Sequence, residues 1–268
     1  MAAASQGLFT SSLPELYERF LVEPLFRPFA GELLDRAGVT ANDTLLDVAC
    51  GTGIVARLAR QKTGGAVVGV DASPAMLAMA RSVAPEIDWR QGDAARLPVG
   101  GDETFTVVTC HQGLQFFADK AGAIREMRRA LAPSGRAAIA TWLPADDIPL
   151  LRDLQRVAER HLGPIADQRH SFGDADAIRQ LLADAGLHVI RVDTVARTIR
   201  MKHDIEVFPR LNTMALVAMS AAANAMTDAE RAEVSAAISN ESVEAAQRYV
   251  DGSDLAFELS SNIVVAHA

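Results

Sequence analysis

The sequence predicts an α/β fold in which a seven-stranded, mostly parallel sheet is covered by helices on both faces. From residue 44 onward, short apolar runs alternate with stretches of helical periodicity, which is the pattern of repeated strand–helix units. Two of these runs, V-V-G-V at 67–70 and F-T-V-V-T-C at 105–110, are almost continuously apolar, as expected of strands buried on both faces. With 268 residues, of which 49% are hydrophobic and 22% charged, the chain is long enough to enclose a substantial core.

The elements follow in order along the chain. Residues 13–37 alternate apolar and charged positions at helical spacing but hold three prolines, so we expect a helical segment broken into short pieces. Strands are predicted at 44–49, 66–70, 87–90, 105–110 and 136–142, with helices that begin at Gly53, Pro74 and Lys120. We then expect helices at 150–162 and 174–185, the second capped by Asp174 and Gly186, and strands at 187–197 and 255–266. Residues 203–250 are rich in Ala and Met and predict several helices.

This pattern divides the chain into three parts. We expect residues 1–40 to form an N-terminal helical preamble. The sheet core should comprise residues 41–142, 174–200 and 253–268. Helical insertions at 143–173 and 201–252 should cover the substrate.

Composition and charge narrow the classes of partner. The formal net charge of −8 argues against a protein that grips nucleic acid. We expect no membrane partner, because the first ten residues do not resemble a secretion signal and the apolar segment Met214–Met226 is too short to span a bilayer of ~30 Å. The two cysteines, Cys50 and Cys110, end predicted buried strands, which fits a reducing cytoplasm. The oligomeric state stays open, with a homodimer as one option, and no cluster of side chains has the spacing of a metal site.

A glycine turn follows the first predicted strand. Residues 51–56, G-T-G-I-V-A, satisfy the G-x-G-x-x-G/A pattern in which a dinucleotide pyrophosphate lies at a helix N-terminus. A match this short fits an NAD(P)-dependent oxidoreductase, but the same turn can hold other nucleotide-like cofactors. The residues around the turn must therefore indicate which cofactor the turn binds.

Three acidic residues lie at successive strand ends. Asp47, inside the first strand, can accept a hydrogen bond from a cationic or amino group, and Asp71, which ends the second strand, can accept from both hydroxyls of a ribose. Asp93, just beyond the third strand, can recognise the amino edge of adenine, and Met76 can lie over the adenine ring. The fourth strand brings C-H-Q-G-L-Q-F, residues 110–116, to the same sheet edge. All four strand ends therefore converge on one predicted pocket.

The chain resembles the class I S-adenosylmethionine-dependent methyltransferases, and within them the small-molecule group called type 11. The motifs that carry this resemblance are Y-E-R-F, L-L-D-V-A-C-G-T-G, V-V-G-V-D-A-S-P-A-M-L, G-D-A-A-R-L-P and R-E-M-R-R-A-L-A-P-S-G-R, and they cover nearly the whole chain. The resemblance implies a Rossmann-like sheet with an antiparallel last strand, a helical lid, S-adenosyl-L-methionine as cofactor and S-adenosyl-L-homocysteine as product. Two positions depart from the family pattern: Ala49, where the fullest form has glycine, and Ser134, in a turn often written P-G-G.

The resemblance also implies which residues bind the cofactor. They are Tyr17, Asp47, Ala49, Gly51, Gly53, Asp71, Ala72, Met76, Asp93, Ala94 and His111. In this assignment the residues from the first strand and its turn line the methionine and ribose, while Met76, Asp93 and Ala94 surround the adenine. His111 closes the pocket, and Tyr17 reaches in from the preamble.

Two histidines are candidate general bases for a hydroxyl acceptor, His111 at the end of the fourth strand and His170 in R-H-S-F-G-D. The alternatives are that His111 only packs on the cofactor and that His170 is structural. An apolar acceptor pocket could include Phe116, Trp142, Phe208 and Met214, although Phe and Met at helical spacing also fit a core.

These observations favour a methyltransferase that acts on a small, partly apolar molecule, with O-methylation favoured over N- or C-methylation. Two alternatives stay open. One is the NAD(P)-dependent oxidoreductase that the glycine pattern allows. The other is a protein that binds S-adenosylmethionine without methylating, such as an S-adenosylmethionine-dependent cyclase.

Overall fold

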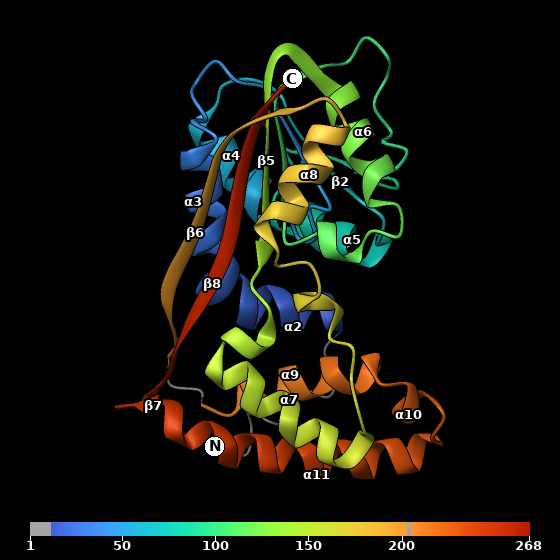
Figure 1. Ribbon diagram of the computed structural model, residues 1–268, viewed down its shortest axis with the longest axis vertical. Helices are drawn as coiled ribbons and strands as arrows, with labels where there is room; N and C mark the ends of the chain where they lie inside the picture. The colour runs from blue at the N-terminus through green and yellow to red at the C-terminus, as the bar shows by residue number, and fades with distance from the viewer. Residues whose placement is uncertain (1–11, 203–204) are drawn as a thin grey trace. The chain divides into compact units, whose positions relative to one another are not determined.

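The expected sheet is present in the computed structural model, which describes residues 12–202 and 205–268 (Figure 1). Its strands are β1 (Leu45–Val48), β2 (Val67–Asp71), β3 (Asp88–Gln91), β4 (Phe105–His111), β5 (Leu131–Trp142), β6 (His188–Met201), β7 (Val250–Asp251) and β8 (Asp254–His267). They follow the order β3-β2-β1-β4-β5-β8-β6, and the two-residue β7 pairs with β8. The first five strands are parallel, whereas β8 runs antiparallel to β5 from Arg136↔His267 to Trp142↔Ser261. The predicted fold class is confirmed. The structure also contains β7, which the sequence did not predict because a two-residue strand is too short to show a hydrophobic period.

The described residues fall into two units. The sheet unit comprises residues 12–142, 172–195 and 261–268. The helical unit comprises residues 143–171, 196–202 and 205–260. Strands β6 and β8 each contribute residues to both units.

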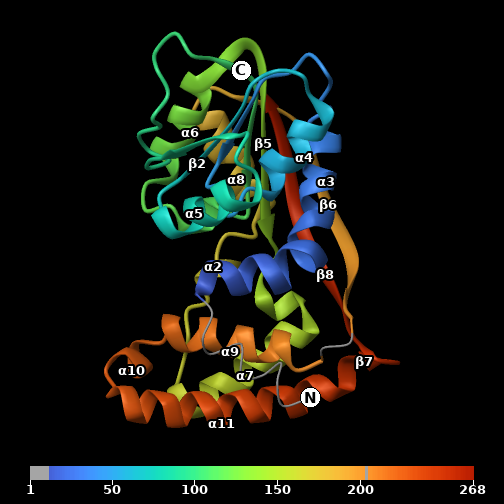
Figure 2. The same cartoon turned by 180° about the vertical axis from the view of Figure 1, so that it is seen from behind.

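Helices cover both faces of the sheet unit. They are α2 (Leu13–Leu16), the π-helix η1 (Tyr17–Phe26), α3 (Arg27–Arg36), α4 (Ile54–Lys62), α5 (Pro74–Val83), the 3-10 helix η2 (Leu114–Phe116), α6 (Lys120–Ala130) and α8 (Ala175–Asp184). Figures 1 and 2 show α3 and α4 on one side of the sheet and α6 and α8 on the other. The expected caps are present, since the Asp174 carboxylate accepts from the backbone N–H of Asp176 at 2.9 Å and Gly186 adopts a φ of 78°.

The preamble is divided into three short helices, α2, η1 and α3, as the sequence predicted. The residues that join α2, η1 and α3 all keep right-handed helical backbone angles. Pro14 and Pro28 lie in the first turn of their helices, where the missing N–H costs no hydrogen bond, and Pro24 lies inside the π-helix. The three helices therefore follow one another directly, without a loop between them.

The helical unit has a core of its own. Its helices are η3 (Ala145–Asp147), α7 (Pro149–Leu162), η4 (Gln168–His170), α9 (Val207–Met219), α10 (Ala221–Asn224), α11 (Asp228–Ala246) and η5 (Gln247–Tyr249). Val157 and Leu162 of α7, Leu216 of α9 and Ile238 of α11 are buried together in one apolar cluster. Within the described ranges, no helix combines the length and the apolar character needed to cross a membrane.

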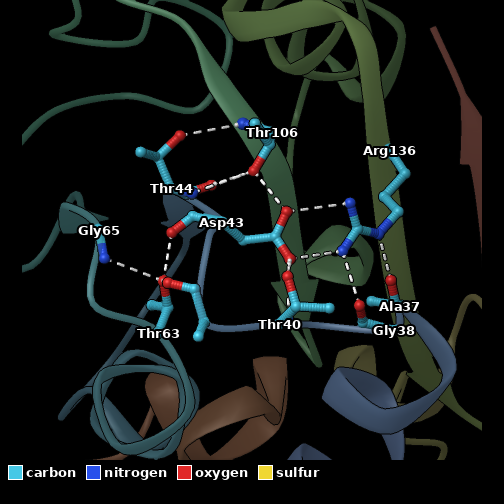
Figure 3. Close-up of polar contacts among 10 residues, drawn as sticks. Ala37, Gly38, Thr40, Asp43, Thr44, Thr63, Gly65, Thr106 and Arg136 are labelled. Carbon is cyan, nitrogen blue, oxygen red and sulfur yellow. Dashed lines mark hydrogen bonds and ion pairs between the residues drawn. The ribbon is translucent and has the colours of Figure 1, made fainter.

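A buried carboxylate ties together the strand ends opposite the predicted pocket (Figure 3). Asp43, which is only 6% exposed, precedes β1, while Thr106 lies near the amino-terminal end of β4 and Arg136 lies in β5, paired with Val107 of β4. The guanidinium of Arg136 donates to both oxygens of Asp43 at 3.1 and 2.8 Å, and Thr106 and Thr40 donate at 2.7 to 2.9 Å. Burial alone would raise the pKa of Asp43, but the bonds from Arg136, Thr106 and Thr40 outweigh it and hold this pKa well below its usual range.

Replacing Asp43 by Asn is expected to lower the free energy of unfolding by about 3–5 kcal/mol, because Arg136 then keeps a largely buried charge without its partner. The measurement is urea denaturation at about pH 7. Because the folded pKa of Asp43 is depressed, its contribution is complete above the unfolded pKa of about 3.9 and is lost as the pH falls below that value. The control is Asp35→Asn, which removes an exposed pair with Lys62 and should cost about 0–1 kcal/mol. Equal losses in the two variants would contradict this role for Asp43.

Candidate active site

A cavity of about 670 Å³ lies at the carboxyl-terminal edge of the parallel strands, within the sheet unit. Its volume falls in the range of about 300–1,000 Å³ that is typical of small-molecule sites. It is lined by Tyr17 of η1, residues 47–51 of β1 and its turn, Ile54 and Val55 of α4, residues 70–73 and Met76 after β2, residues 92–95 after β3, and residues 111–113 and 116–119 after β4. The predicted convergence of four strand ends is therefore present.

Asp47 lines this cavity, and one of its carboxylate oxygens is buried without a close hydrogen bond. The residue is only 1% exposed, and its Oδ1 accepts a hydrogen bond from Thr109 Oγ1 at 2.9 Å. Its Oδ2 is buried and makes no close hydrogen bond among the described residues, although the backbone N–H of Ala56 lies near enough to the carboxylate to lower its pKa. Burial raises the pKa of Asp47 to about 7. A buried oxygen of this kind indicates a missing donor, and a cationic donor would satisfy it best.

The turn after β1 adopts left-handed backbone angles. Ala49 and Gly51 both have φ of 57°, and Gly53 has φ of 89°. Ala49 and Gly51 line the cavity, whereas Gly53 does not. A Cβ on Gly53 would lie 2.2 Å from the ring of Trp89, so glycine is required there for packing as well as for the turn.

The Asp71 carboxylate holds this turn in place through hydrogen bonds. Its Oδ2 accepts from the backbone N–H of Gly51 at 2.8 Å, and its Oδ1 accepts from that of Ser73 at 2.8 Å. Each oxygen keeps a further lone pair, so the carboxylate can still accept from two hydroxyls. Ala72 lies beside it in the cavity lining.

The residues expected at an adenine ring also lie at the cavity. Met76 is half-buried in the first turn of α5, and Ala94 is buried. Asp93 is exposed, and its Oδ1 accepts from the backbone N–H of Ala95 at 2.8 Å, which fixes the direction of the carboxylate. The three residues come from two neighbouring elements and together line the β2–β3 end of the cavity.

His111 and Tyr17 line the cavity on its aromatic side. The His111 ring is 8% exposed, meets the ring of Phe26 edge-on at 6.1 Å, and its Nε2 has no partner among the described residues. Burial lowers the pKa of His111 to about 3, so the imidazole is uncharged at neutral pH. The Tyr17 ring lies 4.7 Å from that of Phe26, and burial together with the charge of Glu18 raises the pKa of its phenol.

Several predicted acceptor or catalytic residues do not line this cavity. Trp142 is 6% exposed and packs edge-on against Phe29 at 4.8 Å, so it belongs to the core of the sheet unit. Phe208, Met214 and His170 lie in the helical unit. Phe208 stacks on Phe257 at 5.0 Å, Met214 is 40% exposed, and His170 Nδ1 donates to the carbonyl of Leu143 at 2.7 Å. Of the four predicted acceptor-pocket residues, only Phe116 lines the cavity.

The cavity lining includes Gln112, a polar residue to which the sequence analysis assigned no role. Gln112 follows β4, is 6% exposed and has a left-handed φ of 57°. Its Nε2 donates to Ser261 Oγ at 3.0 Å, while its Oε1 is buried without a partner among the described residues. Such a conformation costs a non-glycine residue about 1–3 kcal/mol and is found mainly at functional sites. The signal available in the sequence was only a polar side chain directly after a buried strand.

Ala49 and Gly113 form a matched pair across the cavity wall. A Cβ on Gly113 would lie 2.6 Å from the Cβ of Ala49 and 3.1 Å from Cys110 Sγ. The methyl group that replaces the family glycine at position 49 is therefore accommodated because position 113 has no side chain. Among the described residues, no group of three or more His, Cys, Asp or Glu side chains could hold a metal ion.

Replacing Gly113 by Ala is expected to lower the free energy of unfolding by about 1–3 kcal/mol, because the new methyl group overlaps that of Ala49. Adding Ala49→Gly should recover part of this loss, with a coupling energy of at least about 0.5 kcal/mol in a double-mutant cycle followed by urea denaturation. The control is Gly31→Ala on α3, where nothing lies within 4 Å of the new Cβ and the change should be neutral or stabilising. Strictly additive effects at positions 49 and 113 would contradict the contact.

Comparison with known proteins agrees with this geometry. Residues 46–139 match the family model described as a methyltransferase domain. The chain is 46% identical over 145 residues to the 2-phytyl-1,4-naphthoquinone methyltransferase of Thermosynechococcus vestitus, a match that covers 50% of this chain and 62% of that protein, less than two thirds of its length. It is 31% identical over 206 residues to the trans-aconitate 2-methyltransferase of Paracidovorax citrulli, covering 76% of each.

A solved structure supports the fold. The [4+2]-cyclase SpnF superposes with a TM-score of 0.56 at 20% identity, covering 90% of this chain and 80% of that one. Taken together, the sheet order, the cavity at the ends of its parallel strands and these matches show that the chain belongs to the class I S-adenosylmethionine-dependent methyltransferase family.

Proposed function

We propose that this protein transfers the methyl group of S-adenosylmethionine to a small, partly apolar acceptor, with a hydroxyl oxygen as the favoured target. The observation that carries the proposal is the order of acidic residues along the cavity, with Asp47 on β1, Asp71 on β2 and Asp93 beyond β3. This order matches the amino group, ribose and adenine of one extended cofactor.

The residues present fit this cofactor. The unpartnered Asp47 Oδ2 needs a cationic donor, and the α-ammonium group of S-adenosylmethionine provides one. The left-handed turn at Ala49 and Gly51, which lines the cavity, would let the backbone approach the methionine portion closely. Asp71 would hold the ribose diol, and Met76 and Ala94 would contact the adenine.

The lining disfavours a dinucleotide. Among the lining residues that the structure describes there are four carboxylates, Asp47, Asp71, Asp93 and Asp119, and no Lys or Arg. A pyrophosphate carries negative charge and would meet like charges at several points. The literal glycine pattern therefore does not favour an oxidoreductase here.

The acceptor class follows from the relatives and from the lining. The two relatives named above act, by their names, on a naphthoquinone and on trans-aconitate, both of which are small molecules. Phe116 and Phe117 line the β4 end of the cavity and offer apolar surface beside His111. The relatives favour a small acceptor, and the two phenylalanines favour one with an apolar body.

When bound, S-adenosylmethionine supplies an electrophilic methyl group on a sulfonium. The chain's own residues position the acceptor and exclude water, and such positioning is worth up to about 7–11 kcal/mol of the barrier. In this proposal His111 Nε2 would accept the proton that the acceptor hydroxyl loses when it is methylated. Burial keeps the His111 imidazole uncharged, so Nε2 can accept a proton, and the low pKa makes it a weak base.

Calorimetry should show that the protein binds S-adenosylhomocysteine and does not bind NAD. At about pH 7, binding should release part of a proton, because Asp47 is half-protonated in the free protein and becomes ionised beside the ammonium group. Affinity should fall by up to about tenfold for each pH unit below 7, and Asp47→Asn should abolish this dependence and weaken binding by roughly 10–100-fold.

Asp102→Asn, which changes an exposed acid outside the cavity, is the matched control and should leave both the affinity and its pH dependence unchanged. An affinity that is independent of pH in the wild type would remove Asp47 from the cofactor site. Binding of NAD in place of S-adenosylhomocysteine would overturn the proposed function.

Transfer of tritium from methyl-labelled S-adenosylmethionine to a panel of phenols and hydroquinones should identify an acceptor. With that acceptor, His111→Gln should lower kcat by about a hundredfold or more while S-adenosylhomocysteine affinity stays within about twofold. His161→Gln, which alters an ion pair with Glu241 in the helical unit, should leave kcat unchanged. An unchanged kcat in His111→Gln would exclude the base role, and cofactor binding without transfer to any acceptor would favour the cyclase alternative.

A further inference from the structure

The helix η1 is wound as a π-helix along its whole length, Tyr17–Phe26. Its hydrogen bonds span five residues, as in the bond that the backbone N–H of Arg27 donates to the carbonyl of Val22. Pro24 disfavours ordinary α winding here, because its ring would meet the carbonyl of Phe20 and its missing N–H would leave that carbonyl without a partner. Segments wound in this way are rare and often lie at functional sites, so the position of η1 beside the cavity is significant.

The π winding places the two ends of η1 on one face. Tyr17 and Phe26 are nine positions apart, which is about two and a half turns of an α-helix, so α winding would direct them to opposite faces. A π-helix holds more residues in each turn, and the same nine positions complete about two turns. The two rings accordingly lie together, with centroids 4.7 Å apart and planes tilted by 41°.

The Phe26 ring also contacts the ends of two strands. Its centroid lies 6.1 Å from that of His111, which ends β4, and 5.9 Å from that of Trp142, which ends β5. Tyr17 and His111 line the cavity, whereas Phe26 and Trp142 do not. Phe26 is therefore the side chain that joins a lining residue of the preamble to a lining residue of the sheet.

An ion pair attaches the start of η1 to the helix that follows the glycine turn. Arg57 of α4 donates to both carboxylate oxygens of Glu18 at 2.8 and 3.1 Å, and both side chains are only 18% exposed. This pair fixes the backbone beside Tyr17. The direction of the Tyr17 ring depends in addition on its aromatic neighbour, Phe26.

Tyr17 lies near the acidic residues that we propose for cofactor binding. The charges of Asp71 and Asp47 both contribute to the raised pKa of its phenol, so the hydroxyl lies within electrostatic range of the two carboxylates. All three residues line the same cavity. A change in the direction of the Tyr17 ring would therefore change the space that the cofactor occupies.

We infer that Phe26 is a positioning residue for the cofactor, which holds the Tyr17 ring at the cavity while it packs on His111. Phe26 does not line the cavity, so it acts through Tyr17, and the π winding of η1 makes their contact possible. Aromatic pairs contribute more than the area they bury, so the contact can fix the direction of a ring. The inference rests on the proposed function, because it concerns the cofactor side of the same site.

The test is a double-mutant cycle on the full chain, read as S-adenosylhomocysteine affinity by calorimetry. Phe26→Leu removes the ring and is expected to weaken binding by roughly three- to tenfold, because Tyr17 loses the neighbour that directs it. In a Tyr17→Leu background the same change should alter the affinity by less than about twofold. A merely structural role for Phe26 would not make its effect depend on Tyr17.

Phe29→Leu is the matched control. Phe29 belongs to the same aromatic cluster and is fully buried, but its ring packs on Trp142, at 4.8 Å. This variant should lower the urea midpoint of unfolding at least as much as Phe26→Leu, yet leave S-adenosylhomocysteine affinity within about twofold in both backgrounds. If Phe26→Leu does not fold, Phe26→Met takes its place, since Met adapts to an irregular gap but also lacks the ring.

Three results would overturn the inference. The first is wild-type affinity in a folded Phe26→Leu or Phe26→Met variant. The second is a pair of losses that multiply fully in the double variant, because Phe26 would then not act through Tyr17. The third is an equal loss of affinity in Phe29→Leu, which would indicate a general loosening of the cluster. Failure of the wild type to bind S-adenosylhomocysteine would instead refute the proposed function.

Discussion

The geometry of the site depends on the hydrogen bond from the Gly51 backbone N–H to the Asp71 carboxylate. This bond, 2.8 Å long, joins the turn after β1 to the end of β2 and holds three left-handed residues in place before α4 begins. Because the turn is fixed against β2, Ala49 and Gly51 line the cavity together with Asp47 and the residues that follow β4. A turn that moved by one residue would separate the groups that the four strands bring together.

Much of this arrangement could be predicted from the sequence, for a simple reason. Parallel strands end at the same edge of a sheet, so Asp47, Asp71 and Asp93 could be placed together once the apolar strands had been recognised. The strands themselves were recognisable because V-V-G-V and F-T-V-V-T-C are apolar at nearly every position. Local capping signals such as Asp174 also predicted a helix start that the structure confirms.

Other features depend on contacts that no local pattern reveals. Trp142 ends a strand as the pocket residues do, yet it turns into the core because the ring of Phe29, far earlier in the sequence, lies 4.8 Å away. Ala49 is matched to Gly113, which lies in another turn more than sixty residues away in the sequence. From the sequence alone, Ala49 could therefore be interpreted only as a departure from the family pattern. Gln112 depends on Ser261 near the end of the chain. Each case is a long-range contact that sets the direction of one side chain.

The two ends of the sheet use buried polar groups in opposite ways. At the amino-terminal end, both oxygens of Asp43 are satisfied by Arg136 and hydroxyl donors, so the buried charge contributes to folding. At the carboxyl-terminal end, the partners of Asp47 and Gln112 are incomplete, and each unpaired atom costs folding free energy. A bound ligand supplies the missing hydrogen bonds, so the free energy that these atoms cost in folding is recovered on binding. Since the unpaired atoms are all able to accept, they select for ligands that donate, and the same lining can hold a cationic cofactor next to a neutral hydroxyl. The unpaired acceptor atoms at this end of the sheet thus determine which ligands the site selects.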